Sequence, residues 1–279
     1  MVRGIFMINI REYISMRKWS LTIRILPLVL LIILIKYAVH VGQFEFVTSN
    51  PYLPSLVAAT VFLIGFLITG VLSDYKESEK LPGELATSIE TIADEAQIIY
   101  MNKKSPEAKN FLLYLRSFSK SIEDWFYHKI KTRELMANLR GFNGYFAALE
   151  AQTQPAFISR IKQEQHNIRK VVTRIHTISE TSFIGSGYAI AEGISALLIL
   201  TILLTKFEPF LESMFFFVPV VYLFVYMIAL IRDLDNPFEY DVHGEGDVEV
   251  SIKEIHDQVK RMDERIAELD TEKIQVGNK

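Results

Sequence analysis

Long hydrophobic runs, arranged as two pairs, are the strongest pattern in the sequence. They cover residues 25–41, 56–72, 187–205 and 210–231. A helix needs about 20 mainly apolar residues to cross the hydrocarbon core of a bilayer. The pattern therefore predicts an all-α membrane protein with four transmembrane helices in two hairpins, within residues 25–72 and 185–232.

The stretch between the hairpins, residues 73–184, is charged, and its apolar residues recur at intervals of three and four. Leu85, Ile89 and Ile92 are one example, and Pro106 and Pro155 interrupt the pattern. This spacing is typical of helices that bury one stripe. We expect a helical cytoplasmic domain that is continuous with the second and third spans.

The C-terminal stretch, residues 251–279, contains a narrow apolar seam on an otherwise charged helix. The seam consists of Ile252, Ile255, Val259, Met262, Ile266 and Leu269. Alternating steps of three and four predict a coiled-coil segment of about three heptads. We expect the seam to join identical chains, and packing on the chain's own cytoplasmic domain is the alternative.

The second span differs from the others because small residues alternate with aromatic ones. Residues 56–72 carry no charge, and Phe62 and Phe66 lie among Ala58, Thr69, Gly70 and other small residues. Small residues allow close helix approach in lipid. Several such helices with inward phenylalanines would form a narrow apolar constriction lined further along by Thr69 and Gly70. The alternative is one more helix of a bundle, with its phenylalanines facing lipid.

The distribution of basic residues predicts the orientation in the membrane. Residues 1–24 are basic between apolar positions, which is typical of an amphipathic segment lying at the membrane surface. Basic residues also follow the second span, and Arg232 follows the fourth. The positive-inside rule then places both termini in the cytoplasm of a multi-pass protein of the cell membrane.

Lys36 is a charged residue within the first span. A buried lysine is costly unless it faces water or extends to the membrane surface. One interpretation is that Lys36 faces an aqueous vestibule and attracts anions. The other, which we favour slightly, is that its stem extends outward so that the ammonium group reaches the interface.

Composition excludes several classes of function. The net charge is −3, which gives no support for nucleic-acid binding, and no cysteine is available for disulfides or thiolate catalysis. No nucleotide-binding, metalloprotease or serine-hydrolase motif is present, so we expect no enzyme and no cofactor.

Residues 233–250 form an acidic segment after the fourth span. Seven acids, including Asp233 and Asp235, lie between positions 233 and 249. Carboxylates clustered in a loop suit Ca²⁺, with Asp233 and Asp235 as candidate ligands. A solvated acidic loop is the interpretation that we favour.

The chain resembles the bestrophin channels in topology and in two short segments. These are Gly65-Phe66 followed by Tyr75, Glu79, Leu81 and Pro82, and the acidic segment Asp233–Asp241 with its Pro237-Phe238. The resemblance implies a pentamer around the second span. It also implies a neck of apolar residues one turn apart, at Ala58, Phe62 and Phe66.

These observations favour a homo-oligomeric, pentameric ion channel that conducts an inorganic ion across a lipid membrane. The resemblance, together with Lys36, implies an anion such as chloride. Two alternatives remain open at this point. One is a cation-selective channel of the same architecture, and the other is a non-conducting scaffold or signalling protein that uses its cytoplasmic helices and coiled coil.

Overall fold

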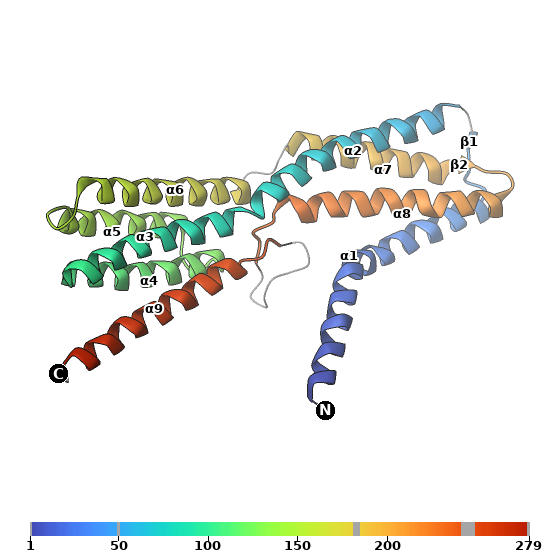
Figure 1. Cartoon of the computed structure of the whole chain (residues 1–279). Coiled ribbons are helices and arrows are strands. Elements are labelled where there is room, and N and C mark those ends of the chain that lie inside the picture. Colours follow the sequence, from blue (N-terminus) through green and yellow to red (C-terminus); the bar gives the residue numbers. More distant parts are fainter. Residues whose placement is uncertain (1, 49–50, 181–184, 241–248, 278–279) are drawn as a thin grey trace. The chain divides into compact units, whose positions relative to one another are not determined.

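The structure is a computed structural model that describes residues 2–48, 51–180, 185–240 and 249–277. Its helices are α1 (Val2–Val41), α2 (Tyr52–Ser78), α3 (Leu81–Lys103), α4 (Pro106–Phe126), α5 (Thr132–Glu150), α6 (Pro155–Glu180), α7 (Gly185–Leu204), α8 (Phe210–Asp235) and α9 (Lys253–Gly277). Two short strands, β1 (Val47–Thr48) and β2 (Thr205–Lys206), complete the described elements (Figure 1). The predicted all-α class is confirmed.

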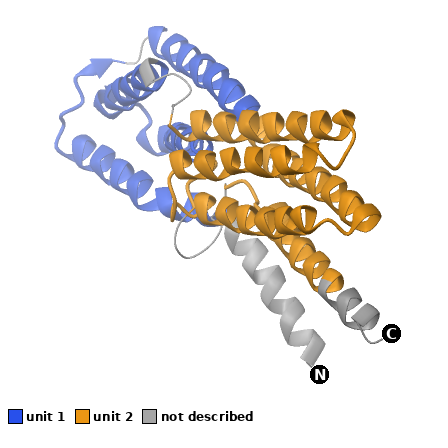
Figure 2. Cartoon of the chain, turned by 90° about the vertical axis from the view of Figure 1, so that its left-hand side faces the viewer, with its two compact units in different colours: residues 1–74, 182–236 blue, residues 75–181, 237–279 orange. Residues whose placement is uncertain are grey.

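The chain divides into two compact units, which Figure 2 shows in blue and orange. Unit 1 consists of residues 1–74 and 182–236, and unit 2 of residues 75–181 and 237–279. The last turn of α2 lies beyond Asp74, so this helix contributes to both units.

Unit 1 contains the helices that are long and apolar enough to span a membrane. These are residues 19–41 of α1, the apolar part of α2, and α7 and α8, so the prediction of four spans is confirmed. Helix α1 packs against α7 and α8. The loops that follow α1 and α7 meet in a parallel pair of two-residue strands, in which Val47 lies opposite Thr205. Strands this short leave no periodic signal, and the sequence did not predict them.

Unit 2 is a helical bundle in which α3 packs against α4, α6 and α9, and α5 packs against α4 and α6. Its helices begin at local signals. Ser105 caps α4, because its hydroxyl accepts a hydrogen bond from the Ala108 amide (3.3 Å) and Pro106 occupies the first turn. The core includes aromatic contacts, such as the edge-to-face pair Phe111–Phe142 with ring centroids 5.5 Å apart.

Helix α9 corrects our expectation for the C-terminal seam. The apolar residues of the predicted seam are buried inside the same chain: Ile252, which precedes the helix, and Ile255, Val259, Met262, Ile266 and Leu269 within it. They face α3 and α4, and ion pairs such as Asp263–Arg116 and Arg261–Glu90 flank them. The seam therefore packs on its own unit, and the prediction that it joins identical chains is wrong. A 3–4 periodic stripe looks the same in sequence for either partner.

Candidate functional site

Helix α2 has two faces of different character within its membrane span. One face is a stripe of buried residues, consisting of Thr60, Ile64, Leu67 and Val71, each at most 4% exposed. With 3.6 residues per turn, this stripe lies on the side of the helix opposite Phe62 and Phe66, roughly 180° away. The two phenylalanines are 78% and 66% exposed.

The exposed face of α2 is polar at both ends and aromatic in the middle. Ser55, Ala58, Phe62, Phe66, Thr69 and Ser73 follow one another along it in steps of three and four, and all six are exposed. The Thr69 hydroxyl donates to the Gly65 carbonyl (2.8 Å), and the Ser55 hydroxyl donates to the Pro51 carbonyl (3.3 Å). Each hydroxyl oxygen therefore keeps lone pairs directed away from the helix. Chemically, this face offers hydrogen-bond acceptors on both sides of an apolar zone.

The other sequence candidate on α2, Gly70, lies at the edge of this face. Gly70 is partly buried. Ala58 also lines an apolar cavity of about 460 Å³, together with Val57 and with Phe207 and Phe217 from the second hairpin. We refer to the six residues from Ser55 to Ser73 as the exposed α2 face.

Between positions 26 and 35, the exposed side chains of α1 are different in kind. Apart from one proline, they are long and aliphatic: Leu26, Leu28, Leu30, Leu31, Leu34 and Ile35. Lipid tails are as apolar as such side chains, so this surface suits contact with lipid. The exposed α2 face is not uniformly aliphatic, because it carries hydroxyl groups on both sides of two phenylalanines.

Lys36 is fully buried, which argues against an open aqueous vestibule around it. Its ammonium group donates to Glu45 Oε1 (2.6 Å), the Leu203 carbonyl (3.1 Å) and the Thr205 carbonyl (2.6 Å). The ring of Phe207 lies 5.1 Å away and adds a cation–π contact. Lys36 therefore does not face an open vestibule, and its ammonium group reaches partners at the C-terminal end of α7 and in the loop after α1.

The partner of Lys36 is itself nearly buried. The Glu45 side chain is 5% exposed, and its second oxygen lies 2.9 Å from His40 Nδ1. The His40 ring in turn stacks on Phe210, with ring centroids 3.8 Å apart. The negative charge of Glu45 balances Lys36, so this site provides no free positive charge to attract an anion.

At the other end of the spans, acidic side chains pair with arginines. Asp233, a candidate calcium ligand, lies 3.3 Å from Arg24, and Glu192 lies 2.6 Å from Arg232. Asp235, the other candidate, lies beside Tyr188. In the described part of the chain, no group of three or more acidic or histidine side chains forms a metal site. The acids at positions 241–248 lie outside the described residues.

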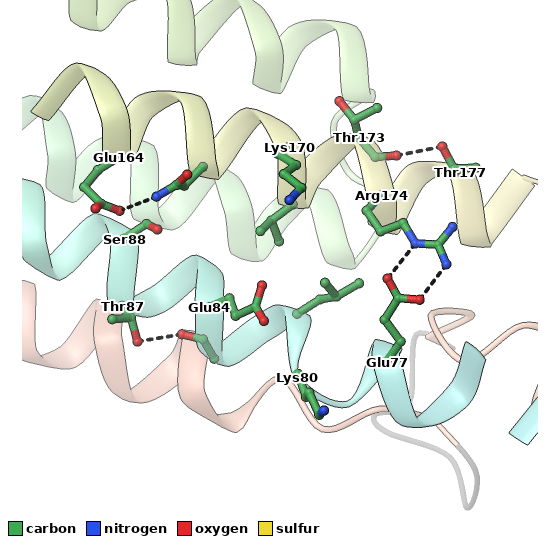
Figure 3. Close-up of a pocket in the computed structure, with 14 residues that line it drawn as sticks. Glu77, Lys80, Glu84, Thr87, Ser88, Glu164, Lys170, Thr173, Arg174 and Thr177 are labelled. Carbon is green, nitrogen blue, oxygen red and sulfur yellow. Dashed lines mark hydrogen bonds and ion pairs between the residues drawn. The ribbon is translucent and has the colours of Figure 1, made fainter. Parts of the chain in front are cut away.

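Unit 2 contains a groove of about 1000 Å³ between α3 and α6 (Figure 3). Three cations and three acids line it: Lys80, Lys170, Arg174, Glu77, Glu84 and Glu164. Arg174 forms a two-point ion pair with Glu77, with distances of 2.8 and 2.6 Å. The formal charges of the lining balance, so the groove shows no preference for an anion or a cation.

Comparison of this fold with solved structures gives a clear result. Two mutants of a bacterial bestrophin homologue from Klebsiella pneumoniae match at TM-scores of 0.67 and 0.69, covering 86% and 87% of this chain and 97% and 99% of theirs. A structure described as a membrane protein matches at 0.71, covering 85% of this chain and 96% of the other. This chain has a bestrophin-like fold. Sequence identity is only 14–15%, and neither a family model nor a curated protein matches the sequence.

Three residues of the candidate site were not identified from the sequence and are apparent only in the structure. Ser55 and Ser73 extend the exposed α2 face beyond the predicted neck, and the helical period would have revealed them. Glu45 neutralises Lys36 from a loop nine residues away. The one available signal was that a buried lysine requires an acidic partner, and Glu45 is the acid nearest to Lys36 in sequence.

Proposed function

We propose that the chain forms a homo-oligomeric ion channel, in which the exposed α2 faces of five copies line the pore. One observation carries the proposal. The face of α2 opposite its buried stripe is uncharged, exposes Phe62 and Phe66, and has hydroxyl groups on both sides of them.

A single chain leaves the exposed α2 face uncovered, and a ring of copies would enclose it. Each copy would contribute Ala58, Phe62 and Phe66 to a shared neck. Five is the number implied by the resemblance to bestrophins. Because the C-terminal seam is buried within its own unit, assembly would have to use other surfaces of the chain.

The proposed neck would work as a hydrophobic constriction. Apolar constrictions gate by excluding water, since an ion that enters must lose part of its hydration shell. The hydroxyl groups of Ser55, Thr69 and Ser73 would replace some of the lost water contacts on either side. Motion of the phenylalanine rings would then control the width of the pore.

The proposed charge of the permeant ion is supported by fewer observations than the proposed pore. Lys36 gives no support for anion selectivity, because Glu45 neutralises it and both side chains are buried. Anion conduction therefore depends on the resemblance to bestrophins alone. A cation-selective channel is the second candidate, and the uncharged pore face is compatible with it.

The membrane orientation is part of the proposal. We propose that both termini and unit 2 lie in the cytoplasm of a cell-membrane protein, and the basic residues of positions 1–24 and those after the α2 span support this orientation. A non-conducting scaffold has less support, because the seam with which it would recruit partners is buried against α3 and α4.

Planar-bilayer recording of the purified protein tests the neck. We expect Phe62→Ala together with Phe66→Ala to raise single-channel conductance or open probability several-fold, because both changes remove the apolar constriction. Phe215→Ala is a matched control, since Phe215 on α8 is 77% exposed and lies outside the proposed pore. Unchanged conductance and gating in the double variant would contradict this neck.

Selectivity requires a separate measurement, the reversal potential across a salt gradient. We expect Lys36→Met together with Glu45→Gln to leave the sign of the reversal potential unchanged, because the two charges already cancel and both side chains are buried. A change of sign in this double variant would show that the pair acts on the permeant ion. The wild-type value decides between anion and cation conduction.

A further inference from the structure

We infer that Lys36 and Glu45 form a clamp that joins the loops of the two membrane hairpins and thereby positions the first turn of α2. We define the clamp as Lys36, Glu45 and the carbonyl groups of Leu203 and Thr205. The inference rests on the proposed function only in taking α2 as the pore helix. The experiments below measure stability and thiol labelling, which do not require that the protein conducts ions.

The ammonium group of Lys36 makes every hydrogen bond available to it. A lysine carries three donor hydrogens, and three acceptors lie within 3.1 Å: Glu45 Oε1, the Leu203 carbonyl and the Thr205 carbonyl. Breaking a buried ion pair by removing one partner is costly, because the other charge is left without compensation. This geometry makes Lys36 a connector between α1, the loop after it and the end of α7.

Two of these acceptors come from the C-terminal end of α7. Leu203 lies in the last turn of that helix, where carbonyl groups have no partner within the helix. A positive charge at this end also interacts favourably with the helix dipole. Lys36 therefore caps α7 from a different hairpin, which links the two hairpins at one end of the span.

The third acceptor links the clamp to α2. Glu45 lies two residues before β1, and β1 pairs in parallel with β2, whose first residue is Thr205. Helix α2 begins at Tyr52, shortly after β1. The Lys36–Glu45 pair and the strand pair thus hold residues 45–48, the described segment that precedes α2.

Helix α2 depends on this connection because its sides give limited support. Its buried stripe is one residue wide, and Phe62 and Phe66 on the opposite face are largely exposed. In the described part of unit 1, the more extensive helix contacts are those among α1, α7 and α8. The segment held at β1 is accordingly the feature that positions the first turn of α2.

The first test is thermal unfolding of the full-length protein in detergent. We expect Lys36→Met and Glu45→Gln to lower Tm by about 6 °C or more, because each leaves a buried polar partner unsatisfied. The double variant Lys36→Met/Glu45→Gln is expected to recover part of this loss. Lys206→Met is the matched control, since the Lys206–Glu208 pair is exposed (56% and 72%) and exposed pairs contribute little.

The second test measures the position of α2 directly. The chain has no cysteine, so a single introduced cysteine reports its own environment. We expect Lys36→Met to change the labelling rate of Ser55→Cys by a water-soluble thiol reagent at least threefold. Ser73→Cys, near the other end of α2, should change less than twofold. Equal changes at both positions would indicate general loosening and would overturn the positioning role.

Restoration by a crosslink completes the test. Thr48 lies opposite Lys206 in the strand pair, so Thr48→Cys with Lys206→Cys would join β1 to β2 by a disulfide. In the Lys36→Met background, we expect the oxidised crosslink to return Tm toward the wild-type value. The labelling rate of Ser55→Cys, measured after the disulfide has formed, should also return toward the wild-type rate. Reduction should remove the effect on Tm. The inference is overturned if Lys36→Met matches wild type in both readouts, or if the formed crosslink restores neither.

Discussion

At the scale of single residues, Glu45 is the acid whose ionisation controls the clamp. Burial acts to raise the pKa of the Glu45 carboxyl, but hydrogen bonds from Lys36 and His40 outweigh it and hold this pKa below its usual value of 4.5. A carboxyl whose pKa is lower in the folded state than in the unfolded state stabilises the protein at pH values above its unfolded pKa. This contribution is lost as the pH falls through the lower, folded pKa.

The prediction is a pH dependence of stability that depends on Glu45. We expect the Tm of the wild type to fall as the pH drops below about 4.5, and the Tm of Glu45→Gln to fall less over the same range. Thermal unfolding in detergent between pH 3 and 7 measures both. Parallel Tm curves for the two proteins would show that Glu45 does not contribute this stabilisation.

Individual residues also show what sequence reasoning can reach. It identified Lys36 as a charge that is costly within the span, but it did not foresee that buried partners compensate this charge. Glu45 lies in a loop without periodicity, and Leu203 and Thr205 contribute main-chain carbonyls from a distant hairpin. Main-chain acceptors leave no trace in a side-chain pattern, so only the fold reveals them.

At the scale of elements, the helices were predictable but their partners were not. The spacing of Phe62 and Phe66 placed them on one face of α2, and the structure shows that a buried stripe occupies the opposite face. For α9, the same kind of stripe predicted a helix correctly and its partner wrongly. Periodicity records that a face is covered, and tertiary packing determines what covers it.

Helix α5 offers a prediction with an internal control. A Cβ added at Gly141 would clash with the Tyr114 hydroxyl, whereas a Cβ at Gly144 would meet nothing within 4 Å. Glycine inside a helix is less favourable than alanine by roughly 0.5–1 kcal/mol. Gly144→Ala should therefore stabilise unit 2 by about that amount.

Gly141→Ala should not stabilise the protein, because it displaces Tyr114 from its 2.8 Å hydrogen bond to the Asn138 carbonyl. A lost hydrogen bond of this kind costs about 1 kcal/mol. We expect Gly141→Ala to be less stable than Gly144→Ala by about 1–2 kcal/mol in denaturant unfolding. Equal stability of the two variants would contradict the packing of Tyr114 against α5.

At the scale of the whole molecule, the topology follows from the order of hydrophobic and polar segments. Two apolar hairpins separated by a charged helical segment led to the bestrophin resemblance, and the structural matches at 14–15% identity confirm that fold. The strand pair and the clamp that join the hairpin loops were not predictable. They depend on short segments brought together by the packing of α1 against α7 and α8.

The channel proposal also belongs to this scale, because a pore requires several copies. Cryo-electron microscopy of the purified protein in lipid nanodiscs, viewed down its symmetry axis, tests it most directly. The account predicts five copies around a central opening, with Phe62 and Phe66 of each copy directed toward the axis. Phenylalanines directed into the surrounding lipid, or an assembly without a central opening, would contradict it.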